Sequence, residues 1–342
     1  MDKLTIHVNE PYDIFFCESY GGLKEVIKNR KICIVTDSNV ASLYLDDVKK
    51  ILGDVPSFVF PAGEINKNIN TLQEIYKCFL ANKMDRRSAV VALGGGVVGD
   101  LAGFAAATFM RGLDFVQLPT SLLAQVDAGV GGKTAVDFDG VKNLIGAFHQ
   151  PKLVYINLST LNTLPKEEFT SGMGEVVKHG LIGDADYYEY LHKHCGNIKN
   201  LEPESMKQVV AGSCKIKASV VAADEKETGP REVLNFGHCV GHAIESLSEY
   251  SIPHGCCVAL GMCAALRLSH IDGAEVKRAV KLMEAFGLPT SQADYKPEKI
   301  IETMYKDKKT IDDTLRVVLL KKIGEAYTDN TVSPRCIMEV IA

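Results

Sequence analysis

Three of the nine histidines in this 342-residue sequence lie in one segment, LNFGHCVGHAIESLSEYSIPHG, at residues 234–255. His238 and His242 are four residues apart, and this spacing puts two side chains on the same face of a helix. Two imidazoles so arranged can bind one zinc ion. The zinc-protease pattern is absent, because no glutamate directly follows His238. His254 enters after a proline and is a third candidate ligand.

The histidine segment has helical character from Leu234 to Tyr250. Side chains three and four residues apart would then share one face, and that face would be polar. Buried polar groups need hydrogen-bond partners, so such a face covers an apolar core poorly; a solvated helix face is the alternative. We expect this face to line a site, and its four members are Asn235, His238, His242 and Glu245.

A candidate carboxylate ligand lies upstream, in SGMGEVVKHG at residues 171–180. This motif supplies Glu175, with Lys178 one helical turn further on. One carboxylate and two imidazoles would leave positions on zinc open for substrate oxygens, as a catalytic metal site requires. The spacing leaves open whether His242 is a ligand or an acid/base group. His179, four residues after Glu175, is a further candidate.

GGGVVGD, at residues 94–100, lies where a strand is expected to end and a helix to begin. Glycines let backbone N–H groups approach a diphosphate closely, and the helix N-terminus adds a favourable dipole. The match to G-x-G-x-x-G is weak by itself, and a tight strand-to-helix turn is the alternative. Its position favours a nucleotide, because ligands of open α/β sheets bind beyond the carboxyl ends of strands. Asp37, at another strand end, could accept ribose hydroxyls, which would favour NAD over NADP.

Basic side chains surround these candidates in the sequence. Each alone is most often a surface charge, but together with a metal site they favour a substrate that carries phosphate or carboxylate. They are Arg111, Lys133, Lys142, Lys217 and Arg231.

The composition is that of a globular protein, with 46% apolar and 24% charged residues. The longest apolar stretch, LAGFAAATFM at 101–110, is too short to span a bilayer, so we expect no membrane partner. MDKLTIHVNE has no apolar run of signal-peptide type, and we expect a cytoplasmic protein. The net charge is −5 and no basic stripe with interleaved aromatics occurs, which makes nucleic acid an unexpected partner.

The ten cysteines are scattered and form no C-x-x-C pair. We expect them to stay reduced and to pack as small apolar residues. Three are candidate thiolate ligands only because they neighbour the histidines: Cys239, Cys256 and Cys257.

Hydrophobic periodicity predicts the elements that position these residues. Five β-rich runs alternate with helical patterns, which indicates a parallel sheet with helices on both faces. From Pro165 onward the periodicity is mainly helical, with one strand or hairpin expected at 314–324. We therefore expect an α/β domain at residues 1–164 and a mainly helical domain at residues 165–342. The five runs are at 31–37, 57–64, 88–93, 114–121 and 152–158.

Six motifs occur in this order: GGGVVGDLAGFAAATFMRG, QLPTSLLAQVDAGVGGKTAVD, KNLIGAFHQP, SGMGEVVKHGLI, DEKETGPREVLNFGHCVGHAIE and PHGCCVALGM. Together they resemble the 3-dehydroquinate synthases, within the sugar phosphate cyclase superfamily, from about residue 30 to 320. The resemblance implies a dehydroquinate synthase-like fold, with a Rossmann-like NAD-binding α/β domain and a helical domain that binds zinc or cobalt and substrate. It also implies a phosphate-eliminating lyase of the shikimate pathway, which converts 3-deoxy-D-arabino-heptulosonate 7-phosphate to 3-dehydroquinate and phosphate.

The resemblance implies roles that the spacing leaves open. Glu175, His238 and His254 would bind the metal, while His242 would face the substrate and transfer a proton at its hydroxyl. One of Lys308 and Lys309 would also reach the substrate. The other residues of the substrate pocket would be Asp127, Lys133, Asn143, Lys178, Lys217, Arg231 and Asn235.

A homodimer is also implied, in which Arg111 would contact the substrate phosphate from the partner subunit. The residues that would contact NAD are Asp37, Glu64, Lys67, Gly95, Gly96, Val97, Asp100, Thr120, Ser121 and Lys142.

Three other functions remain as alternatives. A sister sugar phosphate cyclase would differ at the positions of Lys217, Arg231, Leu234 and Asn235, all of which fit the dehydroquinate type here. A metal-dependent polyol dehydrogenase of related fold would accumulate NADH and usually has a richer His/Asp ligand set. A module that holds NAD as a redox sensor would need neither the Glu/His/His set nor a basic pocket.

Overall fold

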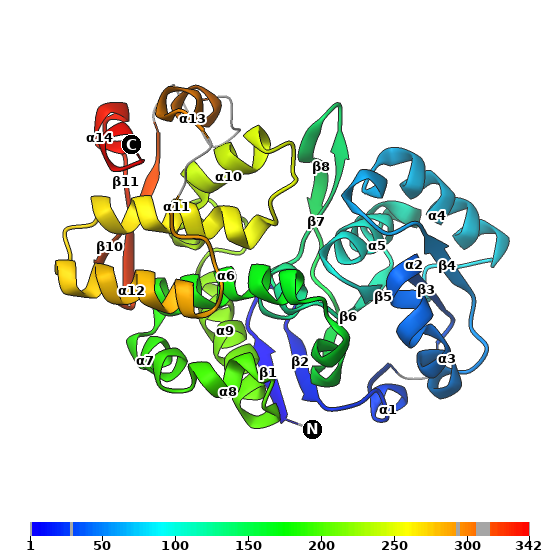
Figure 1. The fold of residues 1–342 in the computed structure, drawn as a ribbon. Helices are drawn as coiled ribbons and strands as arrows, with labels where there is room; N and C mark the ends of the chain where they lie inside the picture. The colour runs from blue at the N-terminus through cyan, green and yellow to red at the C-terminus, as the bar shows by residue number, and fades with distance from the viewer. Residues whose placement is uncertain (1, 28–29, 292–294, 306–314, 342) are drawn as a thin grey trace. The chain divides into compact units, whose positions relative to one another are not determined.

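The computed structural model describes residues 2–27, 30–291, 295–305 and 315–341 (Figure 1). The chain forms two compact units, Met1–Leu164 and Pro165–Ala342, called here the N-terminal and C-terminal units. Lys308 and Lys309, between which the sequence could not choose, lie outside the described residues. Within the described ranges, no helix is long and apolar enough to cross a membrane.

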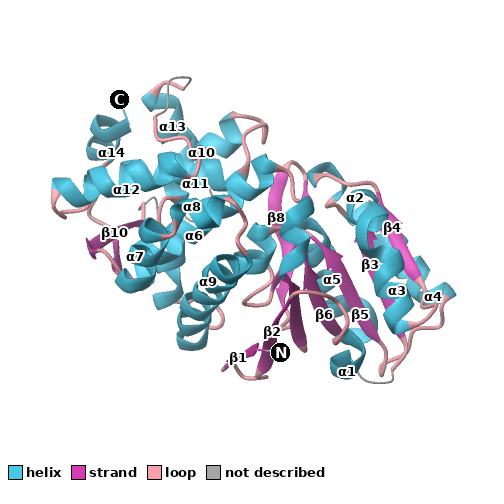
Figure 2. Cartoon of the chain, turned by 60° about the horizontal axis from the view of Figure 1, so that its bottom comes forward, coloured by secondary structure: helices cyan, strands magenta, loops and turns pink. Residues whose placement is uncertain are grey.

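The N-terminal unit is built on a seven-stranded sheet with the strand order β1-β2-β9-β6-β5-β3-β4 (Figure 2). Neighbouring strands are parallel, except that β1 pairs antiparallel with β2. The strands are β1 (Asp2–Ile6), β2 (Tyr12–Cys17), β3 (Ile32–Asp37), β4 (Ser57–Phe60), β5 (Ala89–Gly94), β6 (Asp114–Pro119) and β9 (Leu153–Asn157).

Helices cover both faces of this sheet. On β3, Cys33 packs in one apolar cluster with Leu101 of α5, whereas Ile34 packs in another with Val48 of α3. Strands buried on both faces form continuous apolar runs, and the predicted α/β fold class is confirmed. The helices of the unit are α1 (Leu23–Ile27), α2 (Ser38–Val40), α3 (Asp46–Leu52), α4 (Ile69–Ala81) and α5 (Gly96–Thr108). Its short π- and 3₁₀-helical elements are η1 (Ala41–Leu45), η2 (Glu64–Asn66), η3 (Phe109–Arg111), η4 (Ala124–Ala128) and η5 (Leu158–Thr163).

In the N-terminal unit the structure adds four strands that periodicity did not predict, namely β1, β2 and the hairpin of β7 (Lys133–Phe138) and β8 (Val141–Phe148). The hairpin pairs outside the main sheet. Exposed and partly exposed residues alternate along β8, so it lacks the continuous apolar run of a central strand. The glycine-rich sequence before β7 also has the composition of a loop.

The strand order reverses between β3 and β5, because β3 continues to β4 on one side and β5 to β6 on the other. Ligands of open α/β sheets bind beyond the carboxyl ends of strands at such a reversal. Asp37 ends β3, Gly94 ends β5, and Thr120 follows β6. The expected nucleotide-binding loops therefore lie at neighbouring strand ends of one sheet.

The C-terminal unit is mainly helical, with one two-stranded hairpin (Figure 2). Its longer helices are α6 (Lys166–Gly183), α9 (Pro203–Ala223), α10 (His238–Leu247), α11 (His254–Leu268) and α12 (Gly273–Ala285). The shorter elements are α7 (Ala185–Lys193), α8 (Cys195–Lys199), η6 (Pro230–Asn235), α13 (Pro297–Met304), β10 (Val317–Lys322), β11 (Glu325–Asp329) and α14 (Pro334–Ile341).

Glycines bring α6, α10 and α11 unusually close together. A Cβ atom on Gly255 would lie 1.8 Å from the backbone oxygen of Ser171, and one on Gly174 would lie 2.4 Å from the oxygen of Gly255. A Cβ atom on Gly261 would lie 1.8 Å from the backbone oxygen of Gly237. No larger residue fits at these crossings, so the three helices meet backbone to backbone.

The expected helix at 234–250 was wrong at its start. Gly237 has a left-handed backbone (φ 78°), which ends η6 and lets α10 begin at His238. A Cβ atom there would lie 2.7 Å from the backbone oxygen of Val258, so glycine is required. Asn235 is therefore not on the helical stripe predicted for it; His238, His242 and Glu245 remain together on α10.

Candidate functional site

The centre of the site in the C-terminal unit is the carboxylate of Glu175, which is 0% exposed in the middle of α6. Its Oε2 atom pairs with the ammonium of Lys178, three residues later on the same helix. Its Oε1 atom lies 3.6 Å from Nε2 of His238 and 3.6 Å from Nε2 of His254. One buried carboxylate thus faces an ammonium with one oxygen and two imidazoles with the other.

His242 completes a cluster of three imidazoles. Its ring centroid lies 5.1 Å from that of His238 and 5.8 Å from that of His254. One nitrogen of each of the three rings lies within 4.8 Å of the others, a separation at which they could hold a metal ion. The described groups of side chains that could do so contain no cysteine, and all ten cysteines of the chain are free.

Hydrogen bonds orient two of these rings. Nδ1 of His238 lies 3.2 Å from the backbone oxygen of Phe236, and Nδ1 of His254 lies 3.2 Å from Oε2 of Glu245. Desolvation alone would lower the pKa of His254, but the Glu175 and Glu245 carboxylates outweigh it and raise that pKa to about 9. The two carboxylates thus favour the protonated ring, and a metal ion that binds Nε2 must displace a proton from it.

Cationic side chains are buried in the same unit. Lys178 lies on α6, Lys217 on α9 and Arg231 in η6, and all three are buried. These elements pack against one another, since α6 contacts both α9 and η6, and α9 contacts η6. A buried cation is costly unless an anion or acceptor compensates it, as Glu175 does for Lys178 and the backbone oxygen of Glu225 does for Arg231.

Asp224 organises the loop that carries Arg231. Its carboxylate accepts hydrogen bonds from the backbone N–H groups of Thr228, Gly229 and Arg231. These hydrogen bonds, with that of Thr228 the strongest, lower the pKa of Asp224 to about 2. The guanidinium of Arg231 then donates to the backbone oxygen of Glu225 at 2.6 Å. Asp224 begins the motif DEKETGPREVLNFGHCVGHAIE, but sequence reasoning gave it no role, because most of its partners are backbone groups.

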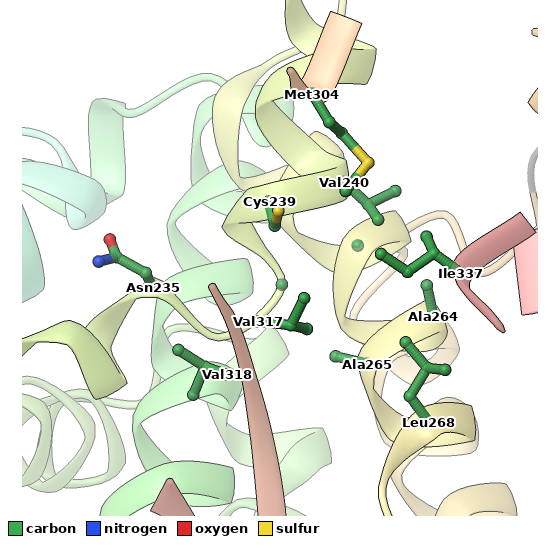
Figure 3. A pocket seen from close by; sticks show the side chains of 12 residues that line it. Asn235, Cys239, Val240, Ala264, Ala265, Leu268, Met304, Val317, Val318 and Ile337 are labelled. Carbon is green, nitrogen blue, oxygen red and sulfur yellow. The ribbon is translucent and has the colours of Figure 1, made fainter. Parts of the chain in front are cut away.

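The C-terminal unit also contains a mainly apolar hollow (Figure 3). Figure 3 shows Val240, Met304, Val317 and Ile337 around it, and shows the amide of Asn235 directed away from them. That amide lies 3.5 Å from Oε1 of Glu227. None of the imidazole-cluster residues lines this hollow, so it is not part of the candidate metal centre.

In the N-terminal unit, the glycine loop begins α5 at the end of β5. Gly95 is the N-cap of α5, and a Cβ atom on it would lie 3.4 Å from Oγ of Ser121. A Cβ atom on Gly96 would lie 3.5 Å from the Cβ of Ala128, so neither glycine is needed for packing. Val97 follows in the first turn of the helix. The glycines instead leave room for a ligand at the N-terminus of α5.

The expected nucleotide contacts include a charged network beside this helix. The Lys67 ammonium is buried and lies 2.6 Å from Asp100 of α5 and 3.7 Å from Glu64. Lys142 of β8 also lies 3.7 Å from Glu64. Burial alone would lower the pKa of Lys67, but the carboxylates of Asp100 and Glu64 raise it, so the lysine stays charged.

Asp37 has a structural role that the sequence did not reveal. Its Oδ1 atom caps α2, accepting from the backbone N–H groups of Asn39 and Val40 at 2.9 Å each. Thr120 and Ser121 follow β6, and the N–H of Thr120 donates to the backbone oxygen of Gly94. These interactions fix the loops at three adjacent strand ends.

The remaining expected site residues lie elsewhere in the N-terminal unit. Asp127 is half-buried in η4, and Lys133 is exposed at the start of β7. Asn143 has a left-handed backbone (φ 51°), and its N–H donates to Oδ1 of Asp137 at 2.8 Å. Arg111 is exposed at the end of η3, also with a left-handed backbone (φ 70°).

Family models for the N-terminal and C-terminal parts of 3-dehydroquinate synthase match residues 57–171 and 172–310. The 3-dehydroquinate synthase of Acetivibrio thermocellus is 44% identical over 356 residues, covering 100% of this chain and 99% of that protein. The 3-dehydroquinate synthase of Pseudomonas putida is 47% identical over 339 residues, covering 95% of this chain and 93% of that protein.

The chain is also similar to solved structures of other enzymes. The 2-epi-5-epi-valiolone synthase of Streptomyces hygroscopicus, with NAD⁺ and Zn²⁺ bound, is 27% identical with a TM-score of 0.89, covering 96% of this chain and 95% of that one. A 2-deoxy-scyllo-inosose synthase complexed with carbaglucose-6-phosphate, NAD⁺ and Co²⁺ is 26% identical with a TM-score of 0.89, covering 99% of both chains. A probable glycerol dehydrogenase from Sinorhizobium meliloti, 14% identical with a TM-score of 0.67, covers 96% of this chain and 95% of that one and shares the fold alone. The family expected from the six motifs is confirmed, and the chain belongs to the 3-dehydroquinate synthase family of enzymes.

Proposed function

We propose that this enzyme converts 3-deoxy-D-arabino-heptulosonate 7-phosphate to 3-dehydroquinate and phosphate, in the shikimate pathway. One observation carries the proposal: a chain of this family holds a buried carboxylate, Glu175, facing Nε2 of His238 and His254. The reaction passes through transient oxidation at C5, loss of phosphate, re-reduction, ring opening and aldol closure. Oxidation at C5 is useful because it acidifies the hydrogen at C6, which must leave with the phosphate.

Glu175, His238 and His254 would hold zinc or cobalt. The residues fit such an ion, because one carboxylate and two imidazoles are a usual catalytic donor set, and both Nδ1 atoms are already engaged elsewhere. Structures of two similar cyclases contain Zn²⁺ or Co²⁺ together with NAD⁺. Such an ion would supply Lewis-acid stabilisation of negative charge that develops on a substrate oxygen.

NAD would be bound by the N-terminal unit, at the strand ends where the sheet order reverses. The N-terminus of α5, with Gly95 and Gly96, suits a diphosphate, and the Lys67 network gives the neighbouring surface fixed charges. When bound, the nicotinamide would supply reversible hydride transfer, so NAD would not be consumed. The other proposed contacts are Asp37, Glu64, Val97, Asp100, Thr120, Ser121 and Lys142.

His242 is assigned proton transfer at the substrate hydroxyl, directly or through water. Its place beside His238 and His254 supports this role. The buried cations Lys178, Lys217 and Arg231 would hold the carboxylate and phosphate of the substrate in register, which is mainly positioning. The other residues proposed to contact the substrate are Asp127, Lys133, Asn143 and Asn235.

We also propose a cytoplasmic homodimer in which Arg111 contacts the substrate phosphate of the partner subunit. Arg111 is exposed, and its neighbour Met110 is a large apolar side chain that is 41% exposed. An exposed arginine beside an exposed apolar residue is a usual feature of protein–protein interfaces.

The test is phosphate release from the heptulosonate phosphate with NAD⁺ present, with and without a chelator. We expect chelator-sensitive release, equimolar dehydroquinate and no net absorbance of NADH. Stoichiometric NADH without phosphate release would instead identify a dehydrogenase and overturn the proposal. The protein must be shown to contain metal before the assay, so that an inactive sample is interpretable.

A second candidate is a sister cyclase that closes a different sugar phosphate, because two such enzymes share the fold with TM-scores of 0.89. Sequence identity favours the first candidate, since 3-dehydroquinate synthases reach 44% and 47% whereas these two reach 27% and 26%. Phosphate release from the sister enzymes' sugar phosphates, and not from the heptulosonate, would decide for the second.

A further inference from the structure

Glu245 lies at the edge of the imidazole cluster, and neither the motif resemblance nor the proposed chemistry gives it a role. It follows His242 by three residues and His238 by seven on α10, so the three share one helix face. Glu245 is only 7% exposed, and its Oε2 atom lies 3.2 Å from Nδ1 of His254, the first residue of α11. A buried carboxylate therefore meets the outer nitrogen of a proposed metal ligand.

This contact fixes which nitrogen of His254 keeps its proton when the other nitrogen binds a metal. An ionised carboxylate only accepts hydrogen bonds, so Nδ1 must be the donor toward Glu245. In the neutral ring the lone pair is then on Nε2, the atom that faces Oε1 of Glu175 at 3.6 Å. Nε2 and Nδ1 point away from each other across the ring, so Glu245 is placed to support a metal at Nε2 and not to bind it.

His238 has the same arrangement with a different partner. Its Nδ1 atom lies 3.2 Å from the backbone oxygen of Phe236, and its Nε2 atom also faces Oε1 of Glu175. The His238 side chain is 10% exposed, whereas that of His254 is 27% exposed. Packing therefore restrains His254 less, and its orientation depends more on the carboxylate that holds it.

We propose that Glu245 is a positioning residue for the metal: it fixes the tautomer and ring orientation of His254 and makes that imidazole a stronger ligand. The inference rests on the proposed function, because it assumes that Glu175, His238 and His254 bind the ion. Carboxylates in this position typically change metal affinity by 10- to 100-fold.

The test compares Glu245→Ala and Glu245→Gln with the unsubstituted protein. Zinc affinity is measured by competition with a chromophoric chelator, and the visible spectrum of the Co²⁺-loaded protein reports on ligand geometry. We expect Glu245→Ala to weaken zinc binding about 10- to 100-fold and to shift the cobalt bands. Glu245→Gln, which keeps the length and one acceptor oxygen, should lose less affinity and serves if the alanine variant does not fold.

The matched control is Glu189→Gln, which removes an exposed carboxylate paired with Arg278 in the same unit. It should leave zinc affinity and the cobalt spectrum unchanged. Unchanged affinity and spectrum in both Glu245 variants, while the unsubstituted protein binds zinc, would overturn this inference alone, even if their thermal stability fell. Failure of the unsubstituted protein to bind zinc or cobalt would overturn the proposed metal centre as well.

Discussion

Lys178 and Glu175 form an ion pair between consecutive turns of α6, and both side chains are excluded from solvent. The lysine engages Oε2 of the carboxylate, which leaves Oε1 directed at Nε2 of His238 and His254. An isolated carboxylate at this depth would be strongly disfavoured, so the ammonium lets Glu175 stay ionised and ready to bind a cation. The carboxylate of Glu175 therefore contributes both to the stability of α6, through Lys178, and to the candidate metal site, through the two imidazoles.

Replacing Lys178 with alanine should therefore destabilise the metal-free protein. Removing one partner of a buried ion pair typically costs about 3–5 kcal/mol of unfolding free energy, because the other charge is left uncompensated. Chemical denaturation measures this loss. The double variant Glu175→Gln/Lys178→Met, which removes both charges, should recover part of it.

Lys321→Ala is the matched control for Lys178, because Lys321 pairs with Glu325 on the surface with both side chains about half exposed. Exposed pairs contribute about 0–1 kcal/mol, so this variant should unfold almost as the unsubstituted protein does. Equal losses for Lys178→Ala and Lys321→Ala would show that Lys178 does not compensate a buried charge.

His242→Ala should retain the metal and lose turnover. If His242 transfers a proton and is not a ligand, its removal should lower kcat by about 10²- to 10⁴-fold with near-stoichiometric zinc still bound. His238→Ala, in contrast, should lose zinc affinity. Metal content and phosphate release measured on the same preparations separate the two roles, and full turnover of a zinc-loaded His242→Ala protein would exclude the assigned role.

Gly95→Ala should weaken NAD binding without harming the fold. The added Cβ atom would meet Ser121 Oγ at 3.4 Å, a contact that the loop can accommodate, and Gly95 has a negative φ. The methyl group would, however, intrude where the backbone is expected to approach the diphosphate, and we expect a loss of about tenfold in affinity, or ~1.4 kcal/mol. Fluorescence titration with NADH measures this change.

Two other glycine variants serve as controls for the NADH affinity and the stability of Gly95→Ala. Gly196→Ala adds a Cβ atom with nothing within 4 Å; it should leave NADH affinity unchanged and, because Gly196 lies in α8, should not lower stability. Gly94→Ala would bring its Cβ atom within 2.4 Å of Cγ2 of Val98 and should lower the thermal midpoint. NADH affinity of Gly95→Ala equal to that of Gly196→Ala would argue against a diphosphate at this helix end.

Asp224→Asn should reduce stability in a pH-dependent way. The folded-state pKa of Asp224 is held at about 2 by backbone N–H donors, below its ordinary value of 3.8. A lowered folded pKa stabilises the protein above the unfolded pKa, and this contribution disappears as the pH falls through the folded pKa. The stability difference between the two proteins should therefore be constant above about pH 5 and shrink toward pH 2.

Denaturant unfolding between pH 2 and 7 follows this difference, with Asp54→Asn as the control because Asp54 is exposed in the loop before β4. A difference that stayed constant to pH 2 would show that the charge of Asp224 does not organise the loop.

Arg111 and His242 offer a test of the proposed dimer by subunit mixing. Arg111→Ala and His242→Ala homodimers should each be nearly inactive. In a hybrid, one site would have both defects and the other neither, so random mixing should restore about a quarter of full activity. No recovery in samples shown to have exchanged subunits would place Arg111 in its own subunit's site.

The local sequence was sufficient to predict the parallel strands, the shared face of two histidines and the family. The parallel strands could be predicted because burial on both sheet faces leaves a continuous apolar run, as in SAVVAL before the glycine loop. The four-residue spacing of His238 and His242 predicted a shared face, and α10 places both imidazoles in one cluster. The six motifs identified the family because each specifies several residue types at fixed positions, and the motifs occur in a defined order.

Which helix faces contact one another could be learned only from the tertiary structure. Periodicity shows that Glu175 and His254 lie on helices, but they are nearly eighty positions apart, and only the glycine contacts of α6 with α11 bring them together. The same holds for Glu245, whose place on α10 was visible while its partner on α11 was not. Asn235 is not on the predicted helix face, because α10 begins only after Gly237. Gly237 has a left-handed backbone, and the nearby backbone of Val258 leaves no space there for a side chain. Sequence patterns encode the face of an element, whereas the partner of that face depends on how closely backbones can approach.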